Sequence, residues 1–370
     1  MKLCRNLAFL NDLHLGHHQT PTVHIIKSLM AALPDNTETA ELDIIFLAGD
    51  VFDRLLTYAD DCVFEIHCWI VDLLRLCKKY DILLRVLEGT PSHDNRQSRW
   101  FVELNESAHI NADLAYFDSL AVEYIARFDM HVLYIPDEYS ATCEITKQLV
   151  IEKLASMGLD QVDYTVMHGA FPHQLPSTID QRSVHDPSYY LSITREAVVI
   201  GHVHFYSQYE WIYAGGSLER LRHNEEGPKG HLRIRRMDTG IQAYFVENRN
   251  AMCYVTVLLT DRNETDAKIA LDEQVAVLKA GDYIRVKCRK SDAGLAMMPS
   301  YIGRHHALNW GYTEVKDKGD ERDLIDERIE LLTTPINSGN IASLLLERVA
   351  RNNPHHYDRS VLLLEEVLND

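Results

Sequence analysis

Short apolar runs alternate with helical repeats along the first two-thirds of the chain. Hydrophobic positions recur with a helical period over residues 20–33, 58–80 and 141–157. Between these segments, five runs have the length and the apolar or β-branched composition of buried strands: 4–10, 44–47, 82–87, 164–167 and 197–200. This order of strand, loop and helix predicts an α/β fold with ligand sites at the carboxyl ends of the strands.

After this strand-rich region, the pattern predicts a smaller second unit. Residues 231–236 and 242–247 have the character of a closing hairpin. A strand, a helix and a strand are then expected in close succession, at 253–259, 265–279 and 282–288. Their short spacing indicates a compact β-α-β unit, whereas residues 290–312 have no pattern that assigns them to an element.

A charged, glycine-containing segment separates this unit from a helical tail. Two amphipathic helices are expected in the tail, at 340–351 and 358–368, with a break at Asn352-Asn353-Pro354. We therefore expect the chain to be divided into three parts: residues 1–250, 251–315 and 316–370.

Residues with metal-binding side chains follow each of the five predicted buried strands. They are Asp12 and His14, Asp50 and Asp53, His93, His168, and His202 and His204. On an extended backbone, both members of an Asp-x-His or His-x-His pair project to the same side. A carboxylate and imidazoles together suit Mn²⁺, Fe²⁺ or Zn²⁺. Each motif alone is also typical of a turn, or of a buried histidine whose hydrogen bonds are made within the core. Their recurrence at five strand ends, however, indicates one shared site.

Composition and cysteine use narrow the class of protein. With 46% hydrophobic and 25% charged residues, the 370-residue chain is typical of a soluble globular protein. No apolar run has the length of a membrane span, and none resembles a secretory signal. Seven cysteines without CxxC pairing indicate reduced thiols. We therefore expect a cytoplasmic protein that does not associate with membranes.

The net charge of −18 excludes a protein whose whole surface grips nucleic acid. Any contact with phosphates must come from local basic clusters, from bound metals or from a partner chain. Part of the acidity is itself a hint, because metal sites collect carboxylates. His17 and His18 lie beyond the turn at Gly16, and we expect both to face solvent.

Five ordered motifs resemble those of the calcineurin-like metallophosphoesterases. They are Asp12-x-His14, Gly49-Asp50-x-x-Asp53, Ser92-His93-Asp94, His168, and Gly201-His202-x-His204. Within that superfamily, residues 11–16, 49–53 and 216–220 are most similar to the SbcD-type nuclease subunit of double-strand-break repair complexes. The motifs cover about the first 230 residues, and the remainder matches that family in layout only.

The resemblance implies a two-sheet β sandwich flanked by helices, a small β-α-β capping domain and a helical tail. It also implies a dinuclear site in which Asp50 bridges two divalent cations. The first cation would be held by Asp12, His14, Asp50 and His204. The second would be held by Asp50, His168, His202 and a neutral oxygen of the third motif. Ser92 stands where the family has Asn, and Thr90-Pro91 separates it from Gly89.

The resemblance also gives roles to residues around the cations. His93 would act as the general acid or transition-state stabiliser at the leaving oxygen. Asp53 would orient the metal ligands or steer the nucleophile, and an ordinary surface salt bridge is its alternative. Arg220 and Arg222, close to the Gly-Ser-Leu-Glu-Arg motif, would line a path for DNA.

The chemistry of such a site is general. Two divalent cations about 3.5–4 Å apart clamp the attacking and leaving oxygens of a phosphodiester, and they lower the pKa of bound water. The mixed oxygen and nitrogen ligands suit Mn²⁺ best among the candidates, and they leave Mg²⁺, Fe²⁺ and Zn²⁺ open.

These features predict a metal-dependent DNA nuclease with exonuclease and endonuclease activity, acting in recombination or repair. The resemblance implies that its tail docks on an SbcC-type ABC ATPase and that the nuclease forms a homodimer. For the tail, the alternative is that both helices pack on their own domain. One alternative is a small-molecule phosphodiesterase of the same superfamily. The other is a non-catalytic scaffold that retains binding to DNA or to the ATPase.

Overall fold

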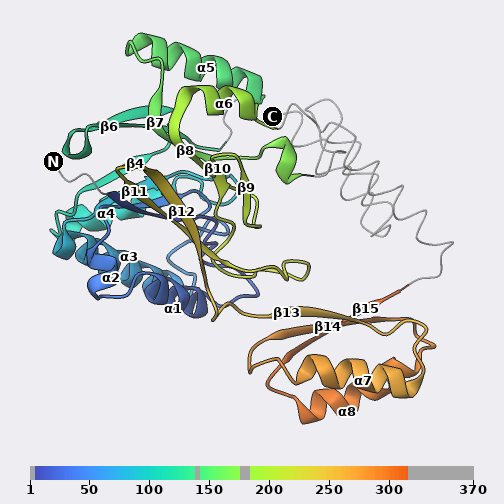
Figure 1. Ribbon diagram of the computed structural model, residues 1–370. Helices are drawn as coiled ribbons and strands as arrows, with labels where there is room; N and C mark the ends of the chain where they lie inside the picture. The colour runs from blue at the N-terminus through green and yellow to red at the C-terminus, as the bar shows by residue number, and fades with distance from the viewer. Residues whose placement is uncertain (1–4, 138–141, 176–183, 316–370) are drawn as a thin grey trace, which may run out of the picture.

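Two mixed six-stranded β-sheets form the centre of the computed structural model, which describes residues 5–137, 142–175 and 184–315 (Figure 1). The strands of the first sheet are β1 (Arg5–Leu10), β2 (Ile44–Ala48), β3 (Leu83–Leu87), β4 (Leu114–Phe117), β11 (Gly230–Met237) and β12 (Gly240–Glu247). Their order is β12-β11-β1-β2-β3-β4. Strands β1 to β4 run parallel, and β11 pairs antiparallel with both β1 and β12.

The second sheet also has a parallel centre. Its strands are β5 (Ala121–Ile125), β6 (Met130–Ile135), β7 (Val162–His168), β8 (Thr194–Gly201), β9 (Ser207–Tyr209) and β10 (Ile212–Ala214). Their order is β5-β6-β7-β8-β10-β9. Strands β6, β7, β8 and β10 run parallel, and β5 and β9 are antiparallel edges. Each sheet therefore has several strands whose carboxyl ends lie at one edge.

Alternate residues of the central strands face different layers. In β1, Leu7 and Phe9 belong to the apolar cluster between the sheets, whereas Ala8 and Leu10 belong to the cluster under the helices. Phe9 stacks on Phe46 of β2 with ring centroids 4.6 Å apart. Because both faces of these strands are buried, their sequences are unbroken apolar runs without polar alternation.

Helices cover the outer face of each sheet (Figure 1). On the first sheet they are α1 (Thr22–Ala32), α3 (Val63–Tyr80) and α4 (Trp100–Ser107), with the short α2 (Thr37–Ala40) beside them. On the second sheet they are α5 (Cys143–Ser156) and α6 (Pro187–Ile193). The prediction of an α/β fold with two sheets flanked by helices is therefore confirmed at this level.

The smaller unit has its own sheet and its own apolar cluster. Its elements are β13 (Tyr254–Leu258), α7 (Glu264–Val275), β14 (Tyr283–Cys288), α8 (Ala293–Arg304) and β15 (Asn309–Glu314), and the strands pair in parallel. The β-α-β unit is present, and the unassigned residues 290–312 contain α8 and most of β15. Pro299 inside α8 explains why the helical pattern was obscured.

Two tyrosines attach this unit to the larger body. Tyr283 Oη donates to the Gln19 carbonyl over 2.7 Å, and Tyr254 Oη lies 2.8 Å from Thr20 Oγ1. The predicted tail helices 340–351 and 358–368, with the whole predicted part 316–370, lie outside the described residues. Within the described ranges, no helix combines the length and the apolar character that a membrane span requires.

Candidate metal centre

The loops that follow β1 and β2 are held together by main-chain hydrogen bonds. The amides of Leu13 and His14 both donate to the Asp50 carbonyl, over 2.8 and 3.0 Å. Asp12, His14 and Asp50 all have positive φ, at 50°, 50° and 48°. The expectation that Asp12 and His14 project from an extended backbone is therefore wrong, because β1 ends at Leu10 and both residues are left-handed. Such conformations are rare outside glycine and cluster at functional sites, where surrounding contacts stabilise them.

The loop after β2 and the loop after β3 approach each other closely, and each has a glycine at the point of approach. A Cβ atom on Gly49 would lie 2.2 Å from His168 Nδ1, and a Cβ atom on Gly89 would lie 2.0 Å from the Asp50 amide nitrogen. Gly49 also has a φ of +87°. The missing side chains therefore allow Asp50 to lie directly between β3 and His168.

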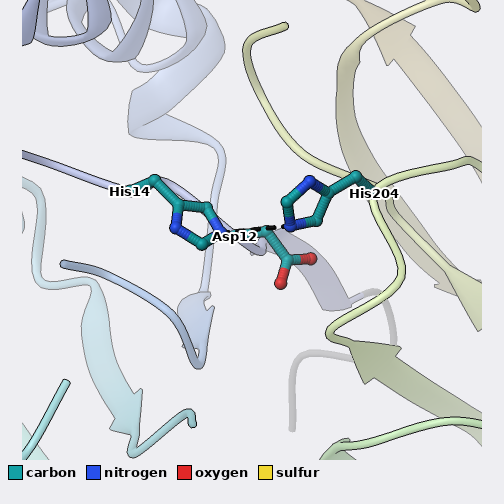
Figure 2. Close-up of side chains that lie close together, drawn as sticks. All are labelled: Asp12, His14 and His204. Atoms are coloured by element: carbon teal, nitrogen blue, oxygen red, sulfur yellow. Dashed lines mark hydrogen bonds between the residues drawn. The ribbon is translucent and has the colours of Figure 1, made fainter. Parts of the chain in front are cut away.

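Asp12, His14 and His204 form the first group whose ligand atoms converge, all within 4.8 Å of one another (Figure 2). The Nε2 atoms of His14 and His204 face each other at 3.1 Å. Behind them, His204 Nδ1 lies 2.9 Å from Glu225 Oε1, and His14 Nδ1 lies 3.2 Å from Asp53 Oδ1. A carboxylate favours the proton on the ring nitrogen it faces, so the lone pair of His204 is on Nε2. His14 Nδ1 lies near Asp53 without forming a hydrogen bond. At this separation the two Nε2 atoms can share one proton or bind one cation.

Asp50, His168 and His202 form the second group, again within 4.8 Å. His168 Nδ1 donates to the Ala48 carbonyl over 2.9 Å, because a carbonyl can only accept. In the neutral ring the lone pair is therefore on Nε2, which lies 3.3 Å from Asp50 Oδ1. His168 Nε2 and Asp12 Oδ2 are buried and have no hydrogen-bond partner within the described residues. Both orphaned atoms fit a site for a positive ion.

Asp50 belongs to the second group and lies next to His14 of the first. Its Oδ2 lies 3.8 Å from His14 Nε2, whereas its Oδ1 faces His168. Burial alone would raise the pKa of Asp50, but the positive charges of protonated His168 and His14 hold that pKa below its usual range. Burial would likewise lower the pKa of His168, but Asp50 and Asp12 raise it well above its usual value. The centre of the cluster therefore strongly favours positive charge.

Asp53 connects the cluster to His93. The Asp53 carbonyl accepts a 2.5 Å hydrogen bond from His93 Nδ1, while the Asp53 carboxylate faces His14. The rings of His14 and His93 meet edge to face with centroids 4.9 Å apart, and His14, Asp50 and His93 form a third convergent group. With Nδ1 bound to a carbonyl, Nε2 of His93 remains for proton transfer.

The neutral oxygen beside the second group belongs to Thr90. Its hydroxyl lies 3.2 Å from Asp50 Oδ2 and 3.4 Å from His202 Nδ1, and its amide donates to Asp50 Oδ1 over 2.6 Å. Ser92, the residue expected in this place, is exposed and lies in the turn that follows. The sequence signal was available, because Thr90 directly follows Gly89.

Two further buried residues support His204 and were not identified from sequence. Glu225 bonds His204 through one oxygen and Lys229 through the other, the latter over 3.0 Å. Lys229 Nζ also donates to Ser217 Oγ and to the His204 carbonyl, each over 2.8 Å. Burial raises the pKa of Glu225 in isolation, but its bonds to His204 and Lys229 lower that pKa below the usual range. Glu225 is therefore an ionised support for the His204 ring.

The two predicted DNA-binding arginines have different surroundings. The Arg220 guanidinium is partly buried, and it donates to the carbonyls of Gly227 and Met252 over 3.0 and 3.4 Å. The Arg222 side chain is 74% exposed, and its Nε lies 3.1 Å from Glu225. Arg220 thus holds the segment that leads into β13, and Arg222 is the one of the pair that reaches the surface.

His17, His18 and Asp53 form a fourth convergent group. His18 is exposed as expected, but His17 is half-buried, and burial is the largest cause that lowers its pKa to about 4. The Thr20 amide donates to His17 Nδ1 over 2.9 Å. The proton of the neutral ring therefore lies on Nε2, and His17 has no free lone pair for a metal.

Comparisons with known proteins add little to this geometry. No protein-family model matches the sequence. No curated protein matches it. A solved crystal structure aligns with 65% of this chain and 99% of its own length, at 11% sequence identity and a TM-score of 0.40. A likeness at this level carries no argument about fold family or function, so the function is argued from the side chains alone.

Proposed function

We propose that this chain is a divalent-metal-dependent nuclease that hydrolyses DNA phosphodiesters, and that its body has the metallophosphoesterase fold. The observation that carries the proposal is the convergence of Asp12, His14, Asp50, His168, His202 and His204, which come from four separate strand ends. His168 and His204 are each oriented by a hydrogen-bond partner at Nδ1, which leaves Nε2 of both rings for a metal. This arrangement is the one that a pair of cations needs.

The identity of the cations follows from the donor atoms. Carboxylate oxygens and imidazole nitrogens in a mixed set favour Mn²⁺, with Mg²⁺, Fe²⁺ and Zn²⁺ as the other candidates. When bound, a pair of divalent cations supplies positive charge to the phosphodiester oxygens and lowers the pKa of a water molecule. Asp12, His14 and His204 would hold one ion, His168 and His202 the other, and Asp50 would touch both.

The chain's own groups provide the proton transfer. His93 is oriented by the bond from Nδ1 to the Asp53 carbonyl. In its doubly protonated form, its Nε2–H would donate a proton to the leaving oxygen of the cleaved strand. Asp53 would position both His93 and His14, because it contacts the first through its carbonyl and the second through its carboxylate. Arg222 would contact a phosphate, whereas Arg220 would act only by holding the main chain.

The wider biological role rests on the resemblance of the motifs. We propose a role in DNA recombination or repair in the cytoplasm, with an SbcC-type ABC ATPase as partner and a homodimer as the working form. The net charge of −18 supports a partner that supplies part of the DNA contact.

The test is a nuclease assay with Mn²⁺ on linear duplex DNA, with a cyclic nucleotide as the competing substrate class. His93→Ala should lower kcat by about 10²–10⁴-fold and leave Mn²⁺ binding intact. Asp50→Ala should abolish both cleavage and binding. His306→Ala, at an exposed histidine of the smaller unit, is the matched control. Turnover of the cyclic nucleotide in place of DNA would favour the small-molecule phosphodiesterase, and an inactive wild type that binds Mn²⁺ would favour the scaffold.

A further inference from the structure

The Thr90 hydroxyl has contacts that a main-chain anchor does not need. Its amide already fixes the loop by donating to Asp50 Oδ1. The hydroxyl in addition lies 3.2 Å from Asp50 Oδ2 and 3.4 Å from His202 Nδ1. The hydroxyl therefore lies beside Asp50 and His202, which form the second convergent group together with His168.

The hydroxyl donates a hydrogen bond to Asp50 Oδ2 in the structure, and these separations are also those of atoms that can share one cation. Two donors each about 2.1 Å from a metal lie about 3.0–3.4 Å apart when the angle between them is octahedral or tetrahedral. The His168 Nε2 to Asp50 Oδ1 distance of 3.3 Å and the His14 to His204 distance of 3.1 Å fall in the same range. We propose that Thr90 Oγ1 is the neutral oxygen ligand of the metal position formed by Asp50, His168 and His202. This assignment rests on the proposed function, since it concerns the same centre.

The position of Thr90 in the chain explains why it, and not Ser92, has this place. Thr90 directly follows Gly89, whose missing side chain lets this main chain approach Asp50. The turn that begins at Pro91 then carries Ser92 to the exposed surface before His93 returns toward His14. A hydroxyl one residue after the glycine thus occupies the space beside Asp50.

The assignment makes the two metal positions unequal. The position at Asp12, His14 and His204 has its own buried carboxylate, and two further carboxylates polarise its imidazoles. The position at Thr90 has only the shared Asp50, a neutral hydroxyl and imidazoles, and a main-chain carbonyl is behind His168. Fewer negative charges and a weaker oxygen donor mean weaker attraction for a divalent cation. The position at Thr90 therefore fills second and exchanges more readily.

The experiment is a calorimetric titration of the metal-free full chain with Mn²⁺. The wild type should bind two ions with separable dissociation constants. Thr90→Val preserves shape and the main-chain bond but removes the hydroxyl, so the weaker site should lose about 10–100-fold in affinity while the tighter site is unchanged. Thr90→Ser should retain wild-type binding. Ser92→Ala, the matched control for a nearby hydroxyl, should also bind two ions normally.

The possible contrary results distinguish a wrong assignment of Thr90 from a wrong proposed function. If Thr90→Val binds two ions as tightly as the wild type, or if Ser92→Ala loses the weaker site, Thr90 is not the ligand and the proposed nuclease function still stands. Equal weakening of both sites in Thr90→Val also overturns the assignment, because it indicates a displaced Asp50. If the wild type itself binds no Mn²⁺, the proposed metal-dependent function fails together with this inference.

Discussion

At the level of single residues, the orientation of His204 depends on two buried charged groups behind it. Glu225 fixes the proton of the ring on Nδ1, and Lys229 keeps Glu225 ionised and in place. A carboxylate behind a ligating histidine raises its basicity and fixes its tautomer. The affinity of a metal bound at Asp12, His14 and His204 would thus depend partly on residues that never touch it.

Glu225→Gln should therefore weaken the tighter Mn²⁺ site by about 10–100-fold, because a neutral amide no longer polarises His204. The same change leaves Lys229 buried without its carboxylate, so the free energy of unfolding should fall by about 3–5 kcal/mol. Calorimetric titration measures the first effect and denaturant unfolding the second. Glu226→Gln, at the exposed neighbour, is the control. Unchanged Mn²⁺ affinity in Glu225→Gln would show that the His204 ring is held by other contacts.

The candidate ligands were predictable from sequence, but their supports were not. Asp12, Asp50, His168 and His204 follow apolar runs that can only be buried strands, so their convergence follows from strand direction alone. The role of Glu225 depends on the loop between β10 and β11, which has no periodic signal. The left-handed conformation of Asp12 and His14 was also hidden, because it arises from main-chain bonds to the Asp50 loop.

At the level of elements, the site depends on close packing between the loop after β2 and the end of β7. Gly49→Ala should destabilise the fold in two ways. A left-handed alanine costs about 1–2 kcal/mol, and displacement of the His168 ring should cost a further amount of about 1–3 kcal/mol. Gly158→Ala is the matched control, since Gly158 has a φ of +67° and open space around its Cβ position.

In denaturant unfolding, Gly49→Ala should therefore lower the free energy of unfolding more than Gly158→Ala does. Mn²⁺ binding should be impaired only by Gly49→Ala. Equal losses of stability, with normal Mn²⁺ binding in both variants, would mean that His168 moves aside without consequence. The comparison separates two losses of stability. A clash of the new Cβ atom with His168 occurs only in Gly49→Ala, whereas both variants have an alanine in the left-handed conformation.

A second element-level feature is the link between α1 and the segment before β13. His24 Nε2 lies 3.3 Å from Glu219 Oε1, and Glu219 also accepts from the Asn248 side chain and the Met252 amide, each over 2.9 Å. The hydrogen bond to Glu219, opposed by burial, raises the pKa of His24 above 6.5. The motif residues Glu219 and Arg220 thus both hold the chain that leads into the smaller unit.

This link predicts a defined pH dependence. Because the folded pKa of His24 is the higher one, its contribution to stability is complete below the unfolded value of 6.5 and is lost as pH rises through the folded pKa. His24→Gln should therefore lower the free energy of unfolding more at pH 6 than at pH 9. Denaturant unfolding of both proteins at both pH values checks this. A difference that is the same at pH 6 and pH 9 would contradict it.

At the level of the whole molecule, the site exists only where the two sheets meet. The first sheet supplies Asp12, His14 and Asp50, and the second supplies His168, His202 and His204. Protein contacts already join the sheets at this edge, since the His202 amide donates to Asp12 Oδ1 and Asn11 Nδ2 donates to the Ile200 carbonyl, over 2.8 and 2.9 Å. A cation in the cluster would add a further link between the sheets.

Because unfolding separates the sheets and so destroys the site, bound Mn²⁺ should stabilise the whole body. For one site, the gain is about 2.7 kcal/mol when free Mn²⁺ is 100 times Kd. The Tm of the full chain should therefore rise with added Mn²⁺ and return to its starting value with a chelator. Asp50→Asn removes the carboxylate that touches both positions and should abolish the rise, whereas Asp238→Asn, in the exposed turn between β11 and β12, should retain it. If Asp50→Asn shows the full rise, Mn²⁺ stabilises the protein from somewhere else, and the two sheets are not joined by a metal at this edge.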